Sequence, residues 1–185
     1  NYNKIIDIKK SPNNDFILFS TITGNYKKLV LYNSKSKKIK VLDKVRSHDK
    51  KESYFLTWKD NENIAYTKNI KGENNLISRN IFSNNKSYKS LSRFDKINGF
   101  SFNSNQNLIV LSASVDNQSD IYLLSANSNN LKKLTNDKSH DIFPSFFKNS
   151  TSIIFSSNRK NTSLEDSKVS ENTSNNYNLF LYNLD

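Results

Sequence analysis

Short apolar runs recur along the chain, separated by polar segments rich in Asn, Ser, Lys and Asp. The runs are dominated by β-branched and aromatic residues, as expected for strands. No segment sustains the 3.6-residue period of an amphipathic helix. The clearest runs are residues 16–19, 64–67, 108–111 and 153–156. This pattern predicts an all-β chain.

The apolar runs belong to a degenerate repeat. Matching Ile17, Ile64, Leu108 and Ile153 gives a period of about 45 residues, the length of one four-stranded propeller blade. A second set of apolar runs follows the first at matching distances: residues 29–33, 76–80, 121–125 and 179–183. In the fourth copy the two runs stand further apart because the polar, Ser/Asn-rich residues 161–176 interrupt it, which indicates a loop insertion.

Each copy predicts the same order of elements. An aromatic first strand (54–58, 99–102 and 144–147) leads through a polar turn into the buried strand. Asn and Asp suit these turns because they bond nearby backbone and tolerate positive φ. A third strand follows, and then a fourth at residues 38–42, 88–91 and 131–134. One such unit is too small to bury both faces, so neighbouring copies must pack face to face, in a propeller or a linear solenoid.

The period and the four strands per copy favour the β-propeller. We expect residues 1–185 to form a single propeller segment with approximate blades 1–46, 47–93, 94–137 and 138–185. The fourth copy reaches Asp185 after only its third strand, so the sequence predicts about four blades of a larger propeller.

The repeat resembles the TolB-type, WD40-like (PD40) propeller repeat. The residues that carry the resemblance are best preserved in the fourth copy: Asp141, Pro144, Phe147, Ile154, Phe155, Ser157 and Arg159. The third copy adds Asp120-Ile121-Tyr122, and Lys133-Leu134-Thr135 resembles the end of such a blade. No copy keeps the turn glycine of the family, and the second copy lacks its Arg and Pro. The resemblance implies blades rather than a reaction, and a place in the bacterial envelope, as in large members from Bacteroidetes-like bacteria.

Charge and composition narrow the function only a little. The net charge of +11 would suit an anionic partner, but the lysines are scattered, so we expect no specific nucleic-acid binding. The chain has no cysteine and hence no disulfide or thiol chemistry. No apolar run is long enough to span a bilayer, so no transmembrane segment is expected.

Two Ser-His-Asp strings occur, at residues 47–49 and 139–141. Consecutive residues cannot readily align as a catalytic triad, so both are interpreted as turns before a first strand. The nucleophile elbow Gly-x-Ser-x-Gly is absent, and three glycines leave no phosphate loop. His48 and His140 lie two repeats apart, so they are not expected to share a zinc ion. The acidic group Glu165, Asp166 and Glu171 lacks calcium-ligand spacing. The sequence therefore predicts no catalytic, cofactor-binding or metal-binding residue, and no cofactor.

Five further residues are weighed from the alignment of the copies. Trp58, Phe102 and Phe147 occupy matched positions at the end of the first strand and are expected in the core between blades. Arg79 and Arg159 are left open: a guanidinium there bonds carbonyls or carboxylates of a blade, or faces a partner at the rim.

The leading hypothesis is a non-catalytic propeller scaffold that binds a protein or peptide, in association with envelope proteins. Residues 161–176 are the best candidate for a partner-specific element, although their composition equally suits a loop without fixed structure. One alternative is an accessory propeller that gates a peptidase or other hydrolase domain outside this segment. Another is a glycan-binding propeller, which the placement of most aromatic residues within strands disfavours.

Overall fold

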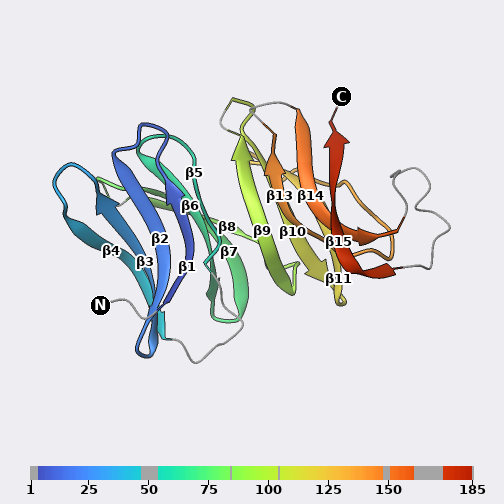
Figure 1. The fold of residues 1–185 in the computed structure, drawn as a ribbon, viewed down its shortest axis with the longest axis horizontal. Helices are drawn as coiled ribbons and strands as arrows, with labels where there is room; N and C mark the ends of the chain where they lie inside the picture. The colour runs from blue at the N-terminus through green and yellow to red at the C-terminus, as the bar shows by residue number, and fades with distance from the viewer. Residues whose placement is uncertain are drawn as a thin grey trace. The chain divides into compact units, whose positions relative to one another are not determined.

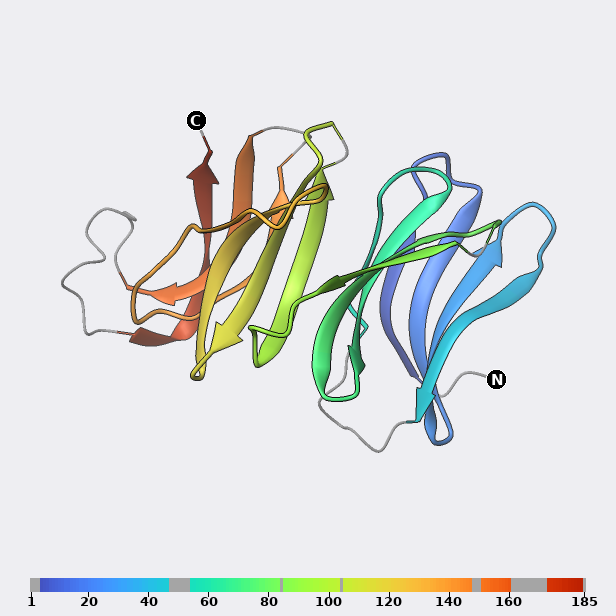
Figure 2. The same cartoon turned by 180° about the vertical axis from the view of Figure 1, so that it is seen from behind.

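The computed structural model describes residues 4–46, 54–83, 85–103, 105–147, 151–160 and 173–184. The chain divides into two compact units, Asn1–Ser92 and Arg93–Asp185. The described residues form strands and turns without a helix. Figure 1 and, from behind, Figure 2 show each unit as a pair of small antiparallel sheets.

The first unit contains two four-stranded sheets, which we call blade 1 and blade 2. Blade 1 consists of β1 (Lys4–Lys10), β2 (Phe16–Thr23), β3 (Tyr26–Asn33) and β4 (Ile39–Arg46). Blade 2 consists of β5 (Leu56–Trp58), β6 (Asn63–Ile70), β7 (Glu73–Asn80) and β8 (Lys86–Ser90). In both sheets the strands lie in the order in which they follow one another along the chain, each antiparallel to the next.

The second unit contains blade 3 and blade 4. Blade 3 consists of β9 (Lys96–Asn103), β10 (Leu108–Val115), β11 (Gln118–Ser125) and β12 (Leu131–Lys133). Blade 4 consists of β13 (Asp141–Phe146), β14 (Ser152–Arg159) and β15 (Thr173–Asn183). Its sheet has three strands in the described residues, in agreement with the fourth copy ending after its third strand.

The predicted strands are confirmed in all four blades. The two sets of apolar runs fall within the second strands (β2, β6, β10 and β14) and the third strands (β3, β7, β11 and β15). The turn chemistry is also confirmed where Asn14 adopts φ 64° between β1 and β2. Asn tolerates this left-handed conformation better than most residues do.

The core of the first unit lies between its two sheets. Side chains of Leu18 and Leu29 from blade 1 meet Ile64, Tyr66 and other apolar groups of blade 2. Each fully buried Leu or Ile side chain contributes about 2 kcal/mol to the stability of the fold. Neither sheet could remove these groups from water alone, which is why the repeat folds as packed pairs.

The second unit is built in the same way. Val110 and Ile121 of blade 3 pack with Ile153 and Phe155 of blade 4, all of them buried. The first strand of blade 4, β13, also packs against β9 and β10 of blade 3. Blade-on-blade packing therefore accounts for the core of both units.

The predicted insertion is shorter than expected at its C-terminal end. β15 begins at Thr173, where it pairs with Arg159 of β14, so residues 173–176 belong to a strand. The backbone pairing with β14 prevails over the polar composition that predicted a loop. The remaining predicted insertion, residues 161–172, lies outside the described residues.

Candidate functional site

The sequence motif of the fourth copy assembles a buried cluster of charges in the second unit. Arg159 donates from Nη2 to both carboxylate oxygens of Asp141, at 2.8 and 2.7 Å. Its Nε donates to Ser157 Oγ at 2.8 Å, and its Nη1 lies 3.2 Å from Asp137 Oδ2. Arg159 is 2% exposed and Asp141 is fully buried. A guanidinium so enclosed stabilises its own blade and is not presented to a partner.

The strand register explains why these side chains meet. Asp141 pairs with Ser157 across β13 and β14, and Arg159 lies two residues beyond Ser157, on the same face of β14. The aromatic rings of Phe155 and Phe180 flank the guanidinium carbon at 5.7 and 5.2 Å. The spacing Asp-x15-Ser-x-Arg thus encodes a structural pair.

A second buried carboxylate lies close to this cluster. Asp120 of β11 forms an ion pair with Lys133 Nζ at 2.8 Å. Burial raises the pKa of Asp120, although its hydrogen bond and charge attraction with Lys133 oppose the shift, and the charges of Asp141 and Asp137 add to it. Burial also raises the pKa of Asp141 against the hydrogen bonds from Ser157 and Arg159. The cluster is a buried, ion-paired polar core, in which Asp120 Oδ1 and Arg159 Nη1 have no hydrogen-bond partner among the described residues.

The second Ser-His-Asp string lies in this region but is not a triad. Ser139 N donates to Asp137 Oδ1 at 2.7 Å, and His140 N donates to Asn158 Oδ1 at 2.7 Å. These are backbone contacts that fix the approach to β13. Asp141 is already the first residue of β13, so the prediction of a turn holds only for Ser139 and His140. Its carboxylate orients Arg159 rather than a histidine.

A related arrangement links the two blades of the first unit. Asp43 of β4 accepts hydrogen bonds from Tyr66 Oη at 2.9 Å and Lys68 Nζ at 2.8 Å. The buried Arg79 donates from Nη1 to the carbonyl of Leu42. Arg79, like Arg159, therefore bonds acceptors within its own unit, which decides between the two alternatives left open by the sequence.

The predicted aromatic stripe is only partly correct. Trp58 is buried in the core between blades 1 and 2, where its Nε1 donates to the carbonyl of Lys9 at 3.2 Å. Phe102 is half-buried. Phe147 was predicted in the core but is 45% exposed. A bulge in β13 between Ile142 and Ser145 shifts the register, so Phe146 takes the core position instead.

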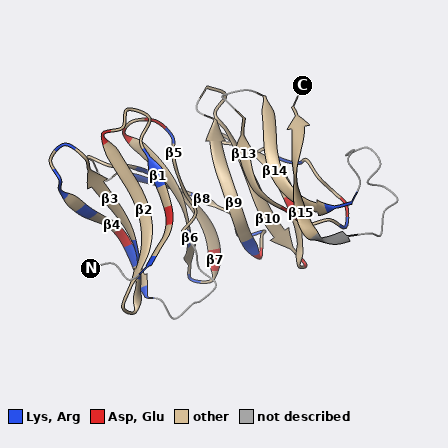
Figure 3. Cartoon of the chain, viewed as in Figure 1, with Lys and Arg blue, Asp and Glu red and all other residues tan. Residues whose placement is uncertain are grey.

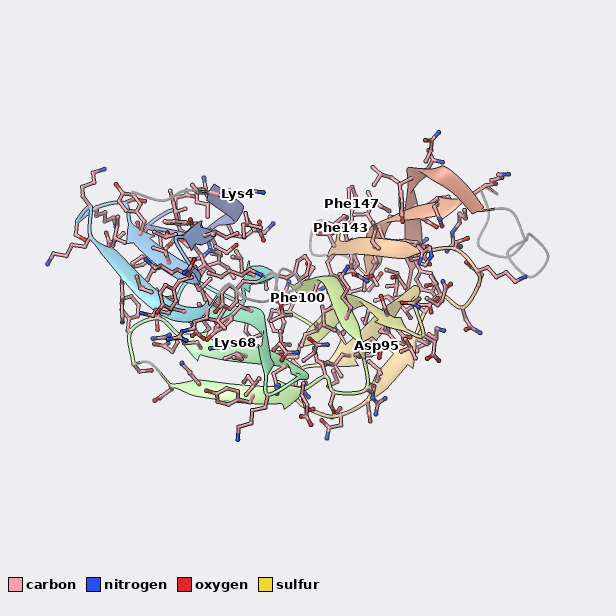
Figure 4. All side chains as sticks on the ribbon, turned by 90° about the horizontal axis from the view of Figure 1, so that it is seen from below. Lys4, Lys68, Asp95, Phe100, Phe143 and Phe147 are labelled. Carbon is pink, nitrogen blue, oxygen red and sulfur yellow. The ribbon has the colours of Figure 1, made fainter. Side chains whose placement is uncertain are left out.

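The same bulge presents an aromatic side chain that the sequence did not single out. Phe143 adopts φ 54° and is 60% exposed. A bulky residue in the left-handed region is a genuine outlier, and such strain tends to gather at functional positions. Figure 4 shows Phe143 on β13, Phe147 just beyond the end of that strand, and Phe100 on β9. We call the two exposed side chains, Phe143 and Phe147, the aromatic surface of the second unit.

Gly99 makes room for Phe143. A Cβ atom at Gly99 would lie 3.4 Å from the Phe143 Cα and 3.5 Å from its Cδ1. Gly99 itself adopts φ 153°. The conspicuous sequence feature here is a glycine within a strand in a chain that has only three glycines. It could have indicated a close approach of backbone at this point.

Several predicted features lie outside the described residues. These are the string Ser47-His48-Asp49, most of the insertion, and its acidic residues Glu165, Asp166 and Glu171. Within the described ranges, no group of three or more His, Asp or Glu side chains is arranged to hold a metal ion. None of the described segments forms a helix suited to crossing a membrane.

Comparison with known proteins shows the fold. No family model and no curated protein matches the chain. A TolB protein of Agrobacterium tumefaciens superposes with a TM-score of 0.74 at 14% identity, over 99% of this chain and 63% of that one. The chain has the β-propeller fold. TolB of Acinetobacter baumannii gives 0.72 at 10% identity, over 97% and 41%.

Propellers attached to peptidases match as well. A puromycin-hydrolysing peptidase of Mycobacterium tuberculosis gives a TM-score of 0.69 at 8% identity, over 85% of this chain and 26% of that one. The chain thus spans less than two thirds of the length of these structures. The structural resemblance to TolB expected from the repeat is confirmed at the level of fold.

Proposed function

We propose that this propeller segment is a non-catalytic scaffold that binds a protein or peptide through the aromatic surface of its second unit. The observation that carries the proposal is Phe143, which stays largely exposed although its backbone is strained. Exposed aromatic side chains on a rigid strand lose little conformational entropy on binding and often supply much of the binding energy. The likeness to TolB supports a place in the bacterial envelope, with envelope proteins as partners.

The domain organisation proposed with it is a single propeller segment that contains all four blades, within a larger propeller. Support comes from the match of one TolB propeller to 99% of the chain. The predicted insertion, residues 161–176, stays the proposed partner-specific element of blade 4, although its last four residues belong to β15.

Phe143→Gly tests the binding proposal. Glycine accepts φ 54° without strain, so the variant should keep or gain stability while losing the aromatic anchor. Peptides selected from a random phage-displayed library against the wild-type protein should bind the variant at least about tenfold more weakly. Binding would be measured by fluorescence anisotropy, and folding by urea denaturation.

Phe82→Ala is the matched control, because Phe82 is also 60% exposed but belongs to the first unit. It should leave the affinity of those peptides unchanged. Equal affinities of the wild-type protein and Phe143→Gly would refute the aromatic surface as the binding site.

The peptidase likeness favours a second candidate, an accessory propeller that gates a hydrolase domain. The full-length reading frame separates the two functions. A Gly-x-Ser-x-Gly elbow on a strand–turn–helix in the same polypeptide would favour the hydrolase, since that geometry exposes a nucleophilic serine. Cell fractionation by osmotic shock would test the envelope location directly.

A further inference from the structure

The last strand of blade 2, β8, has one edge to which no described strand is paired. The order of the sheet is β5-β6-β7-β8, so β8 pairs with β7 alone. Blades 1 and 2 approach each other at their first strands, β1 and β5, which places β8 on the outer side of the sheet. Neighbouring blades of a propeller cover the faces of a sheet and not its outer edge. An edge of this kind can accept an extended segment of another chain.

The fourth strands of blades 1, 2 and 3 differ in how regular their outer edges are. β4 pairs with β3 through a register shift between Leu29 and Val30, which leaves Leu42 without a paired residue. A bulge bends an edge strand and hinders further pairing. β12 has only three residues. β8 pairs with β7 over five residues without a shift, so its edge is the best suited to take another strand.

The hydrogen bonds on either side of β8 show which backbone groups of the strand are turned toward β7. Before the strand, the Asn85 carbonyl accepts from Asn80 N at 3.1 Å. After it, Leu91 N donates to the Asn74 carbonyl at 2.8 Å. Hydrogen-bonded residues alternate along an antiparallel pair. Every second residue counted from Asn85 is therefore bonded to β7.

The residues between them, Lys86, Tyr88 and Ser90, direct their N–H and C=O groups away from β7. All three are exposed. Their spacing of two residues is the one at which an antiparallel strand forms its pairs of hydrogen bonds. The outer edge of β8 thus offers three residues in register for strand addition.

The side chains of β8 define the chemistry of this edge. Tyr88 pairs with Ile77, which belongs to the core shared with blade 1, so Tyr88 lies on that face of the sheet. Lys86 lies on the same face, two residues away. Tyr88 is nevertheless 58% exposed. Lys40 of blade 1 reaches the same end of blade 2, where its Nζ donates to the Ile81 carbonyl at 3.2 Å.

The charge at this edge is positive. Figure 3 shows Lys and Arg spread over the strands of the first unit. β8 carries Lys86 and Lys89 and no acid. The one acid of β7, Glu73, lies beyond the last pair of the two strands, Asn75 with Ser90. Lysines on an edge discourage pairing with a strand of like charge, but they favour a strand with carboxylates at the facing positions.

We propose that β8 binds an acidic, extended segment of another protein, which adds to blade 2 as a fifth strand. In the antiparallel register, an apolar side chain of the segment covers Tyr88, and carboxylates lie opposite Lys86 and Lys89. The main-chain hydrogen bonds supply affinity, and the charge pairs set the preferred sequence. The site lies in the first unit and does not depend on the aromatic surface of the second.

The test uses a short fluorescein-labelled peptide with the central sequence Thr-Glu-Val-Thr-Glu, called the Glu peptide, beside a matched peptide with Gln in place of Glu. The Glu peptide should bind at least about threefold more tightly, because each facing charge pair contributes a few tenths of a kcal/mol or more. Its affinity should fall as salt rises. Fluorescence anisotropy measures both peptides. Equal affinities, or no binding of the Glu peptide at about 1 mM, would overturn the proposal.

Backbone methylation of the peptide separates strand addition from contact through side chains alone. In the proposed register the N–H of the central Val donates to Tyr88, whereas the N–H of the Thr that follows it points away from β8. Methylation of the Val nitrogen should weaken binding at least about fivefold, and methylation of that Thr nitrogen by less than about twofold. The two methylated peptides have the same charge. Equal effects of the two methyl groups would refute strand addition.

Charge reversal locates the site on the protein. Lys86→Glu should bind the Glu peptide at least about threefold more weakly, since an attraction becomes a repulsion. Lys96→Glu makes the same change in net charge at an exposed lysine of β9 and should alter the affinity by less than about twofold. Equal losses in the two variants would show that net charge, and not β8, attracts the peptide.

A proline substitution tests the edge without changing any charge. Ser90→Pro removes an N–H that does not bond β7, so the variant should fold normally and bind the Glu peptide several-fold more weakly. Ser87→Pro removes an N–H that bonds β7 and should instead destabilise the first unit. Urea denaturation measures both stabilities. A folded Ser90→Pro variant that binds as tightly as the wild type would contradict the proposal.

A competing ligand completes the test. Tighter binding of a short single-stranded oligothymidylate than of the Glu peptide, with the same loss in Lys86→Glu, would assign this edge to nucleic acid, whose bases stack on aromatic rings. Lys86→Glu should still bind the peptides selected on the aromatic surface, and Phe143→Gly should still bind the Glu peptide. The two proposals can therefore fail separately.

Discussion

At the residue scale, the most recognisable motif of the sequence has a structural role. Asp141 and Arg159 each satisfy the other inside the second unit, with Ser157 as a third partner. A buried charge left without its partner costs several kcal/mol, because desolvation is no longer offset. The chemistry of this pair is therefore explained by the folding of blade 4.

Asp141→Asn tests this role. The substitution keeps the shape but removes the charge that faces Arg159, and we expect the free energy of unfolding to fall by about 3 kcal/mol. Urea denaturation followed by circular dichroism measures the loss. Asp95→Asn is the control, since this exposed carboxylate bonds the backbone N–H of Asp116 at a turn and should cost less than about 1 kcal/mol. Similar losses from both substitutions would contradict the buried pair.

Sequence reasoning succeeded for side chains whose role repeats in every blade and failed where a local irregularity intervenes. Trp58 was correctly expected in the core, because its position follows the strand period. The prediction that Phe147 lies in the core was wrong, because a bulge in β13 moves Phe146 into the core position. The pattern of apolar residues does not reveal a bulge. The repeat therefore gave no sign that Phe143 is exposed and has a left-handed backbone conformation.

At the element scale, the strands themselves were predictable, because β-branched and aromatic runs alternate with turn residues at a fixed spacing. The start of β15 was not predictable, because its first residues are polar and typical of a loop, yet they pair with β14. The gathering of basic residues on one face of blade 1 was also missed. The lysines looked scattered in sequence, and only the strand register brings Lys10, Lys28, Lys44 and Arg46 onto one side.

The approach of β13 to β9 gives a prediction at this scale. Gly99→Ala adds a methyl group about 3.4 Å from the Phe143 Cα, in a backbone conformation that alanine disfavours. We expect the free energy of unfolding to fall by about 1–3 kcal/mol, with a measurable decrease in Tm by circular dichroism. Gly24→Ala, at a β2–β3 turn with open space around it, should cost only the strain of its φ, about 1 kcal/mol. A Gly99 variant as stable as the wild type would show that the strands do not touch here.

At the scale of the whole molecule, we expect the two units to respond to acid in opposite senses. Burial raises the pKa of Asp43, but the hydrogen bonds from Lys68 and Tyr66 and the charge of Lys68 outweigh it, so its pKa lies below the ordinary value. Asp43 therefore stabilises the first unit above the unfolded pKa of about 4, and this stabilisation is lost as the pH falls through the lower folded pKa.

Asp120 and Asp141 of the second unit have raised pKa values, chiefly through burial. Their protonation is easier in the folded than in the unfolded state, so their contribution is greatest at low pH and is lost as the pH rises through the folded pKa. Acidification below about pH 4 should accordingly destabilise the first unit before the second.

The single tryptophan makes this measurable, because Trp58 lies in the core of the first unit. Its fluorescence should report unfolding at a higher pH than far-ultraviolet circular dichroism, which averages both units. Asp43→Asn should lower the stability of the first unit at pH 7 by about 1–2 kcal/mol and flatten the acid dependence of the Trp58 signal. Coincident transitions by both probes, unchanged in this variant, would contradict the assignment.

The third strand of blade 4 has a consequence for handling the protein. Among the described strands, β15 pairs only with β14, and Leu179 and Leu181 protrude from one of its faces, with Leu179 71% exposed. Where residues 1–185 are handled as a separate protein, this strand edge and the two exposed leucines form a template for adding further copies end to end. Such growth is open-ended, so turbidity should increase steeply with protein concentration. The substitution Leu179→Lys places a charge on this strand and should reduce the aggregation of concentrated solutions.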